Sequence, residues 1–359
     1  MKILHRYIAR EVLSGIGLVF LGLVLLFAFF DLIHELNDLG RGNYTLGRMF
    51  VFVLLAMPAH AYELFPISAL VGTLYGLSNL SQHSEISVMR AAGMSKIQLG
   101  IALGRVGLLL VGMSFLLGEW IMPISESAAQ QWRLSALNSL VATQFRSGLW
   151  VKDEKNFVNI QEILPDTSLR GIKIYTFNQD SRLKSIRFAE RGEYSGDAGI
   201  WKLNNVTETL FEGDQARMVR NPSLPWKSML TPSVLSVLLV APEQMSLWNL
   251  YTYIKHLREN QQRTTRFEIA QWSKALYPFG IIVMMWLAMP FAMYRSRSGG
   301  FGRQIMLGIG LGLSFYLTIR LFSFLGELNN WSPWVSTLAP NIAFLMMTFV
   351  LGRWMERRA

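Results

Sequence analysis

The sequence contains no cysteine and few charged residues. Without cysteine the chain has no disulfide, no thiolate nucleophile and no cysteine-ligated metal site, and this residue says nothing about the redox state of its compartment. Charged residues make up 16% of the 359 residues and hydrophobic residues 51%, a balance that soluble domains do not show. The composition therefore predicts a membrane protein.

Motifs for catalysis and nucleotide binding are also missing. The five histidines fall in no metal-ligand spacing, and no Walker-type glycine loop with Lys and Ser or Thr is present. The glycine cluster at residues 299–302 is typical of a tight loop, and no Gly-x-Ser-x-Gly elbow occurs. We therefore expect a chain that is not an enzyme, with no catalytic residue, no metal and no cofactor. The energy for any work must arrive from another protein.

The net charge of +10 does not indicate nucleic-acid binding. Its basic residues are scattered among loops and span ends, and they form no patch interleaved with aromatic residues. We expect no nucleic-acid partner, because membrane topology explains these charges better.

Apolar runs of about 20 residues recur in two groups, before residue 125 and after residue 265. They predict six transmembrane helices in a 3+3 arrangement, at about residues 12–32, 46–80, 97–117, 267–293, 305–325 and 334–351. The second span contains Pro58 and Pro66, so we expect that helix to be kinked or broken.

The polar region between the two groups has a different period. Its short segments alternate apolar and polar residues and are separated by turn residues, which predicts an inserted all-β domain, a sandwich or jelly roll. The expected division is an N-terminal membrane half (1–123), a stalk helix (124–145), the β-jelly-roll domain (146–242) and a C-terminal membrane half (243–359) that opens with a second polar helix.

The short flanks of the spans carry their positive charge on one side. That side has eleven basic residues against Arg41 and Arg48 on the other: Lys2, Arg6, Arg10, Arg90, Lys96, Arg295, Arg297, Arg303, Arg353, Arg357 and Arg358. The positive-inside rule then places both termini and residues 81–93 in the cytoplasm and the β domain outside, which in a bacterium is the periplasm.

The polar stretch at residues 81–93 is predicted to be a short cytoplasmic docking helix. Ser84 can cap its N-terminus, Glu85 and Arg90 lie where the helix dipole favours an anion and a cation, and Gly93 can end it. A helix of about ten residues is marginal alone, so packing must order it. We expect Ile86 and Met89, with Val88, to make that packing.

Charges near the outer ends of the spans are candidate contacts for a substrate. Lys274 and Arg320 should reach the outer leaflet, and together with Arg41 they could meet an anionic lipid head group. The alternative is that each pairs with a phospholipid or with an acidic residue of the chain: Glu63, Glu119 or Glu327.

Glycines recur at four-residue spacing on three apolar helices, at Gly72 and Gly76, Gly100 and Gly104, and Gly308 and Gly312. Such pairs permit close helix contact. They are equally consistent with packing inside this chain and with an interface to a second membrane subunit.

Several local strings resemble the LptF/LptG family of lipopolysaccharide export permeases. They are LSQHSEISVMRAAG at 80–93, GEW at 118–120, GLWVKDEKNFV at 148–158 and QWSKALYP at 271–278. The resemblance covers the whole chain, and LHRYI at 4–8 and the Gly-Leu-Trp string are closer to the LptG branch than to its paralogue. It implies six spans and a periplasmic β-jelly roll.

The resemblance also implies partners and a role. An LptF-like paralogue, an LptB-like ATPase dimer and an LptC-like single-span protein would work with this chain in the inner membrane of a Gram-negative bacterium. ATP hydrolysis in the partner would drive extraction of lipopolysaccharide from the outer leaflet toward a periplasmic bridge. Residues 81–96 would be the coupling helix, with Glu85 meeting the ATPase and with Ser84, Ile86, Met89 and Arg90 as the other candidate coupling residues. Spans one and five would line lateral gates.

Two points stay open at this stage. Members of the LptG branch can carry lysines at the outer end of span one, where this chain has Asp31, His34, Glu35 and Asp38, so no phosphate-contact role is transferred there. The alternative function is a mechanotransmission or scaffold subunit that acts on a periplasmic partner without carrying lipid.

Overall fold

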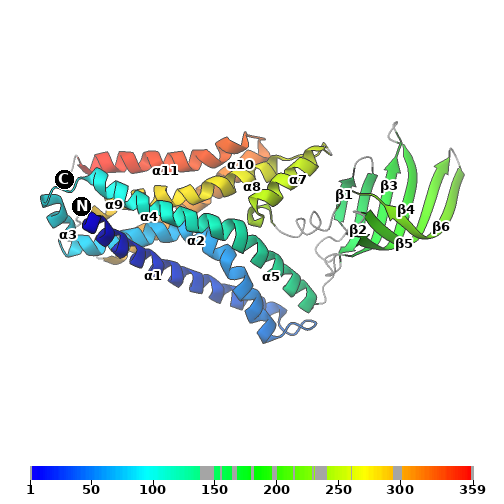
Figure 1. The fold of residues 1–359 in the computed structure, drawn as a ribbon, viewed down its shortest axis with the longest axis horizontal. Coiled ribbons are helices and arrows are strands. Elements are labelled where there is room, and N and C mark those ends of the chain that lie inside the picture. The colour runs from blue at the N-terminus through cyan, green and yellow to red at the C-terminus, as the bar shows by residue number, and fades with distance from the viewer. Residues whose placement is uncertain are drawn as a thin grey trace.

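The computed structural model describes most of the chain. The described residues are 2–137, 149–153, 156–163, 168–178, 182–195, 200–212, 215–228, 230, 241–259, 261–293 and 301–356. A bundle of long helices forms one part, and an antiparallel sheet lies beyond one end of it (Figure 1). Six helical stretches of the described residues are long and apolar enough to cross a membrane, as expected.

The N-terminal half of the bundle contains three of these stretches. Its elements are α1 (Lys2–Glu35), η1 (Leu36–Asp38), α2 (Leu46–Gln82), α3 (Glu85–Ala91), α4 (Lys96–Leu116), the π-turn η2 (Leu117–Ile121) and α5 (Met122–Leu137). Helix α2 is continuous through Pro58 and Pro66 and bends along its length (Figure 1), so the predicted kink is present and the predicted break is not. Helices packed around a proline can stabilise its freed backbone groups.

The C-terminal half supplies the other three. Its elements are η4 (Pro242–Gln244), α7 (Leu247–Glu259), α8 (Thr265–Leu276), η5 (Tyr277–Phe279), α9 (Gly280–Met293), α10 (Phe301–Leu328) and α11 (Pro333–Glu356). The fourth span is thus α8, η5 and α9 in series, with Pro278 in the 3₁₀ turn. The predicted basic loop after α9 begins at residue 294, and residues 294–300 lie outside the described part.

Glycines allow α1 to pack closely against α2. A methyl group at Gly72 would lie 2.3 Å from the Cα of Ile16, and one at Gly15 would lie 2.6 Å from the carbonyl oxygen of Gly72. Gly308 and Gly312 of α10 face α2 in the same way. These glycines therefore serve contacts within this chain, whereas a methyl group at Gly100 would meet nothing within 4 Å.

The described strands of the inserted β domain form one antiparallel sheet. Its strands are β1 (Leu149–Asp153), β2 (Asn156–Ile163), β3 (Leu169–Phe177), β4 (Leu183–Ser195), β5 (Ile200–Glu212) and β6 (Gln215–Trp226), and each pairs with its neighbours in sequence. The described strands therefore run up and down in order. One face buries a core around Trp201, whose indole donates a hydrogen bond of 2.6 Å to the carbonyl of Leu230.

The end of the bundle that holds α3 and the β domain lie far apart. Both termini and α3 gather at one end of the bundle, and the β domain lies beyond the other end (Figure 1). Helix α5 covers the expected stalk up to Leu137, and residues 138–145 of that stalk lie outside the described part. The expected domain division remains a prediction.

Candidate functional site

The short helix α3 forms the corner between α2 and α4 at the end of the bundle that holds both termini. Glu85 lies in its first turn and Arg90 in its last, as expected, and Gly93 follows with a φ of +95°. The expectation that the Ser84 side chain caps the helix is wrong. Ser84 has a φ of 62°, and its side chain makes no capping hydrogen bond because the residue serves as the left-handed corner.

Two side chains fix α3 to the bundle. Ile86 and Met89 are 6% and 7% exposed and belong to the main hydrophobic core of the membrane helices. Val88 was expected to share this packing and does not, because it is 67% exposed. The same core contains Ile8 of α1. Helix α3 is therefore joined to α1 through the core, while Val88 and Arg90 are exposed.

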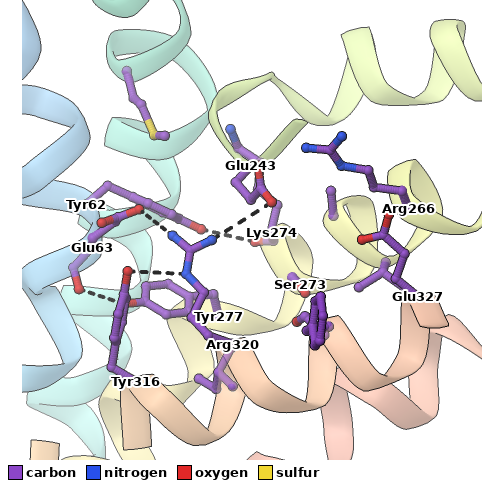
Figure 2. Close-up of a pocket in the computed structure, with 16 residues that line it drawn as sticks. Tyr62, Glu63, Glu243, Arg266, Ser273, Lys274, Tyr277, Tyr316, Arg320 and Glu327 are labelled. Carbon is purple, nitrogen blue, oxygen red and sulfur yellow. Dashed lines mark hydrogen bonds and ion pairs between the residues drawn. The ribbon is translucent and has the colours of Figure 1, made fainter. Parts of the chain in front are cut away.

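A cavity of about 280 Å³ lies at the opposite end of the bundle, between α2, α8 and α10 (Figure 2). One face of α8, continued into η5, and one face of α10 line it with residues at i, i+3, i+4 and i+7 spacing. These residues are Arg266, Ile269, Ala270, Ser273, Lys274 and Tyr277 on one side, and Tyr316, Ile319, Arg320, Ser323, Phe324 and Glu327 on the other.

Arg320 makes several polar contacts on the α2 side of this cavity. Its guanidinium lies 3.1 Å from the carboxylate of Glu63 on α2 and 3.9 Å from that of Glu243 in η4, and it donates a 3.2 Å hydrogen bond to the Tyr316 hydroxyl. Tyr277 donates a 2.6 Å hydrogen bond to the backbone carbonyl of Glu63. Figure 2 shows these side chains pointing toward one another, and they come from α2, α10 and the turns η4 and η5.

Lys274 does not reach the outer leaflet, so that expectation is wrong. It is 5% exposed, and its ammonium donates a hydrogen bond to the backbone carbonyl of Met245. The ammonium also lies 5.9 Å from the centre of the Tyr62 ring. A carbonyl and an aromatic face replace the lipid head groups that a snorkelling lysine would seek.

Arg41 lies in the loop between η1 and α2, where its side chain is 71% exposed and pairs with Asp38 at 2.7 Å. The acidic residues nearby are held inside the chain. Arg133, on α5, contacts Glu35 at 3.1 Å and Asp38 at 2.6 Å. Tyr44 donates a 2.8 Å hydrogen bond to Glu35, and burial together with this bond raises the pKa of Tyr44.

Sequence reasoning missed Glu243 and Arg133 as members of these clusters. Glu243 lies in a short turn after the β domain, and Arg133 lies on a polar helix, so neither carries a local signal. Among the described residues, no group of three or more His, Asp or Glu side chains is placed to hold a metal ion.

Comparisons with known proteins agree with one another. The family described as "Lipopolysaccharide export system permease LptF/LptG" matches residues 6–354. Lipopolysaccharide export system permease protein LptG of Escherichia coli (strain K12) is 32% identical over 359 residues, covering 99% of this chain and 98% of the relative. The Haemophilus influenzae protein of the same name is 32% identical over 348 residues, covering 97% of each. The LptF protein of E. coli is 34% identical over 95 residues, covering 26% of each.

Proposed function

Because the chain belongs to the LptF/LptG family of lipopolysaccharide export system permeases, we propose that it is the subunit through which a partner ATPase drives lipid extraction. The chain is a permease subunit of lipopolysaccharide export and a multi-pass protein of the inner membrane. It is similar to LptG over its whole length and to LptF over about a quarter, as the resemblance of its local strings indicated.

The orientation that we propose places both termini and α3 in the cytoplasm and the β domain in the periplasm. Two observations support it. The basic flanks of the spans lie on the side of the termini and α3, and these features share one end of the bundle while the sheet lies beyond the other (Figure 1).

Helix α3 is the proposed coupling helix, and an LptB-like ATPase dimer would bind it. The observation that supports it most is the division of its side chains, because Ile86 and Met89 anchor the helix in the bundle core while Glu85, Val88 and Arg90 remain for a partner. Because the core that holds Ile86 and Met89 also contains Ile8 of α1, movement of α3 would reach α1. Ile86 and Met89 would act by holding the helix, and Ser84 by turning the chain into it.

The outer cavity is the proposed contact for the charged part of the lipid. Within it Arg320 is the accessible candidate, and Lys274 could contribute only after leaving the carbonyl of Met245. Arg41 does not line the cavity and would meet the head group from the loop before α2. An LptF-like subunit would complete the transport path, and an LptC-like protein would receive the lipid. No cofactor is proposed in this chain, since ATP would be used by the partner.

Charge reversal of Glu85 tests the coupling role. Glu85→Lys should abolish co-purification of the ATPase or uncouple its hydrolysis from lipid release, because a charge-assisted hydrogen bond at a partly desolvated interface contributes about 1.5 to 3 kcal/mol. Glu259→Lys, at a half-exposed position near the end of α7, far from α3, is the matched control and should behave as wild type. Normal co-purification and transport in Glu85→Lys would reject the assignment.

A photocrosslinking assay separates the permease from the two alternative functions. A probe placed in the cavity, for example at Ser323, should crosslink lipopolysaccharide, and ATP should move the crosslink to probes in the β domain. A mechanotransmission subunit or a scaffold would give ATP-dependent changes in its partners with no lipid crosslink at either position.

A further inference from the structure

We propose that Glu119 and Lys274 are positioning residues for lipid transfer, which hold the start of α7 where the chain returns from the β domain to the membrane helices. Glu119 lies in the string GEW at 118–120 and Lys274 in the string QWSKALYP at 271–278. This role rests on the proposed permease function and deepens it, because it concerns the step from the cavity to the β domain.

Glu119 caps α7 from a distant part of the chain. It lies in the π-turn η2 that follows α4, and its carboxylate accepts a 2.9 Å hydrogen bond from the backbone amide of Leu247, 128 residues away. Leu247 is the first residue of α7, so its amide has no partner within the helix. The hydroxyl of Ser246 caps the Asn249 amide instead, at 3.1 Å. A carboxylate at this end also interacts favourably with the helix dipole.

Lys274 holds the same turn through a group of opposite polarity. Its ammonium donates a hydrogen bond to the carbonyl of Met245, two residues before Leu247. The side chain is 5% exposed, and a buried ammonium is stable only when it is hydrogen-bonded. Glu119 therefore binds a backbone donor of residues 245–247, and Lys274 binds a backbone acceptor.

Tyr62, on α2, contacts the elements that carry both residues. A methyl group at Gly118 would lie 2.5 Å from the Tyr62 ring, so glycine there lets the ring lie against the π-turn. The Tyr62 hydroxyl donates a 3.4 Å hydrogen bond to the backbone carbonyl of Lys274, toward which it points in Figure 2. The second, third and fourth spans therefore meet at the start of α7.

The segment that they hold also forms part of the cavity wall. Glu243, in η4, lines the cavity and lies 3.9 Å from Arg320 on α10. Met245 is 3% exposed and belongs to a small core with Leu250 and Tyr253 of α7. Turn η4 is the first element after β6 that the structure describes, so its position constrains where the β domain lies relative to the cavity.

An ion pair and a pair of backbone contacts make different predictions. If Glu119 and Lys274 acted mainly by attracting each other, exchanging the two charges would restore their effect. If each holds a backbone group, the exchange fails. An ammonium cannot accept a hydrogen bond from the Leu247 amide, and a carboxylate cannot donate one to the Met245 carbonyl.

Hydrogen exchange of the full-length chain, followed by mass spectrometry, tests these contacts. Glu119→Leu should speed exchange in the first turn of α7 about tenfold, through the loss of one charge-assisted hydrogen bond. Glu119→Gln keeps a neutral acceptor and should lie between Glu119→Leu and wild type. Lys274→Met should act in the same direction as Glu119→Leu. The swapped variant, Glu119→Lys with Lys274→Glu, should give no protection. Wild-type protection in Glu119→Leu or in the swapped variant would overturn the proposal.

A change in the held segment itself guards against loss of folding. Leu247→Pro removes the amide that Glu119 binds, and proline is favoured at the first position of a helix. It should speed exchange in the rest of the first turn as Glu119→Leu does, and the two changes together should do no more than either alone. Leu247→Ala keeps the amide and should behave as wild type. Additive effects of Glu119→Leu and Leu247→Pro would show that Glu119 does not act through this amide.

Lipid transfer gives a readout that a loss of folding would not give. In the complex with the partner permease and the ATPase, Glu119→Leu should keep co-purification of the ATPase and the lipopolysaccharide crosslink at Ser323, because Glu119 does not line the cavity. The ATP-dependent crosslink in the β domain should fall about tenfold, the factor expected for one charge-assisted hydrogen bond. Glu259→Leu, at a half-exposed position, is the control and should transfer lipid normally. Loss of both crosslinks in Glu119→Leu, or of neither, would overturn the positioning role.

Failure of the proposed function would look different. A wild-type complex that gives no lipid crosslink at Ser323 or in the β domain would reject the permease role, and the transfer role with it. Normal transfer in both wild type and Glu119→Leu would reject the positioning role alone.

Discussion

Arg320 and Glu63 form a 3.1 Å ion pair across the outer cavity, although 257 residues separate them in the sequence. The pair joins α10 to α2, and Glu243 extends it to the segment that returns from the β domain. A movement that separates α10 from α2 would therefore break this ion pair.

We expect Arg320→Ala to lower lipid crosslinking in the cavity and transport, with a modest loss of stability. The two side chains are 44% and 36% exposed, so a double-mutant cycle with Glu63→Gln should give a coupling of about 0.5 to 1 kcal/mol. Thermal unfolding in detergent measures the coupling, and Arg263→Ala serves as the control. Unchanged crosslinking and transport in Arg320→Ala would remove Arg320 from the lipid path.

The close approach of α1 to α2 at Gly72 gives a second prediction. Gly72→Ala should destabilise the protein by about 1 to 3 kcal/mol, because the added methyl group would lie 2.3 Å from the Cα of Ile16 and force the helices apart. Gly17→Ala is the matched control on α1, since nothing lies within 4 Å of its added methyl group. Thermal unfolding of both variants checks this, and equal melting temperatures would contradict the packing.

Local patterns were enough to predict the elements that depend on neighbours in sequence. The six spans follow from apolar runs, and the ends of α3 follow from Glu85, Arg90 and Gly93. Strand alternation indicated the inserted β domain, because a half-buried sheet imposes that period on its own residues.

Contacts between distant segments could not be predicted in the same way. Lys274 was expected at the lipid surface, and only the folded chain places the carbonyl of Met245 against its ammonium. The left-handed backbone of Ser84 has no sequence signature, because serine at that position is equally typical of a cap. Glu243 became part of the cavity only through the return of the chain from the β domain.

The start of α4 gives a third prediction. Ser95 accepts a 3.2 Å hydrogen bond from the Gln98 amide, and its own amide donates one of 3.0 Å to the Gln98 side chain. Removing this capping box with Ser95→Ala should cost about 1 kcal/mol and speed hydrogen exchange in the first turn of α4. Ser87→Ala, at an exposed position on α3, is the control. Equal exchange in the two variants would show that the cap does not hold this corner.

The last prediction concerns pH and His256 on α7. This side chain is 8% exposed and stacks on Tyr253, and burial lowers its pKa, with the charges of Asp153 and Glu259 opposing the shift. A histidine whose pKa is depressed in the folded protein costs no stability at pH values above the ordinary histidine pKa of about 6.5. As pH falls below that value, the unfolded chain takes up a proton that the folded chain resists, so stability is lost.

The melting temperature should therefore fall by a few degrees at most between pH 7.5 and pH 5.5, values chosen to bracket an ordinary histidine pKa of about 6.5. His256→Phe preserves the ring contact with Tyr253 and removes the titration, so its melting temperature should change less over this range. His83→Phe, on an exposed histidine after α2, is the matched control and should keep the wild-type dependence. If His256→Phe loses stability as steeply as wild type, other groups carry the acid sensitivity and the buried imidazole does not.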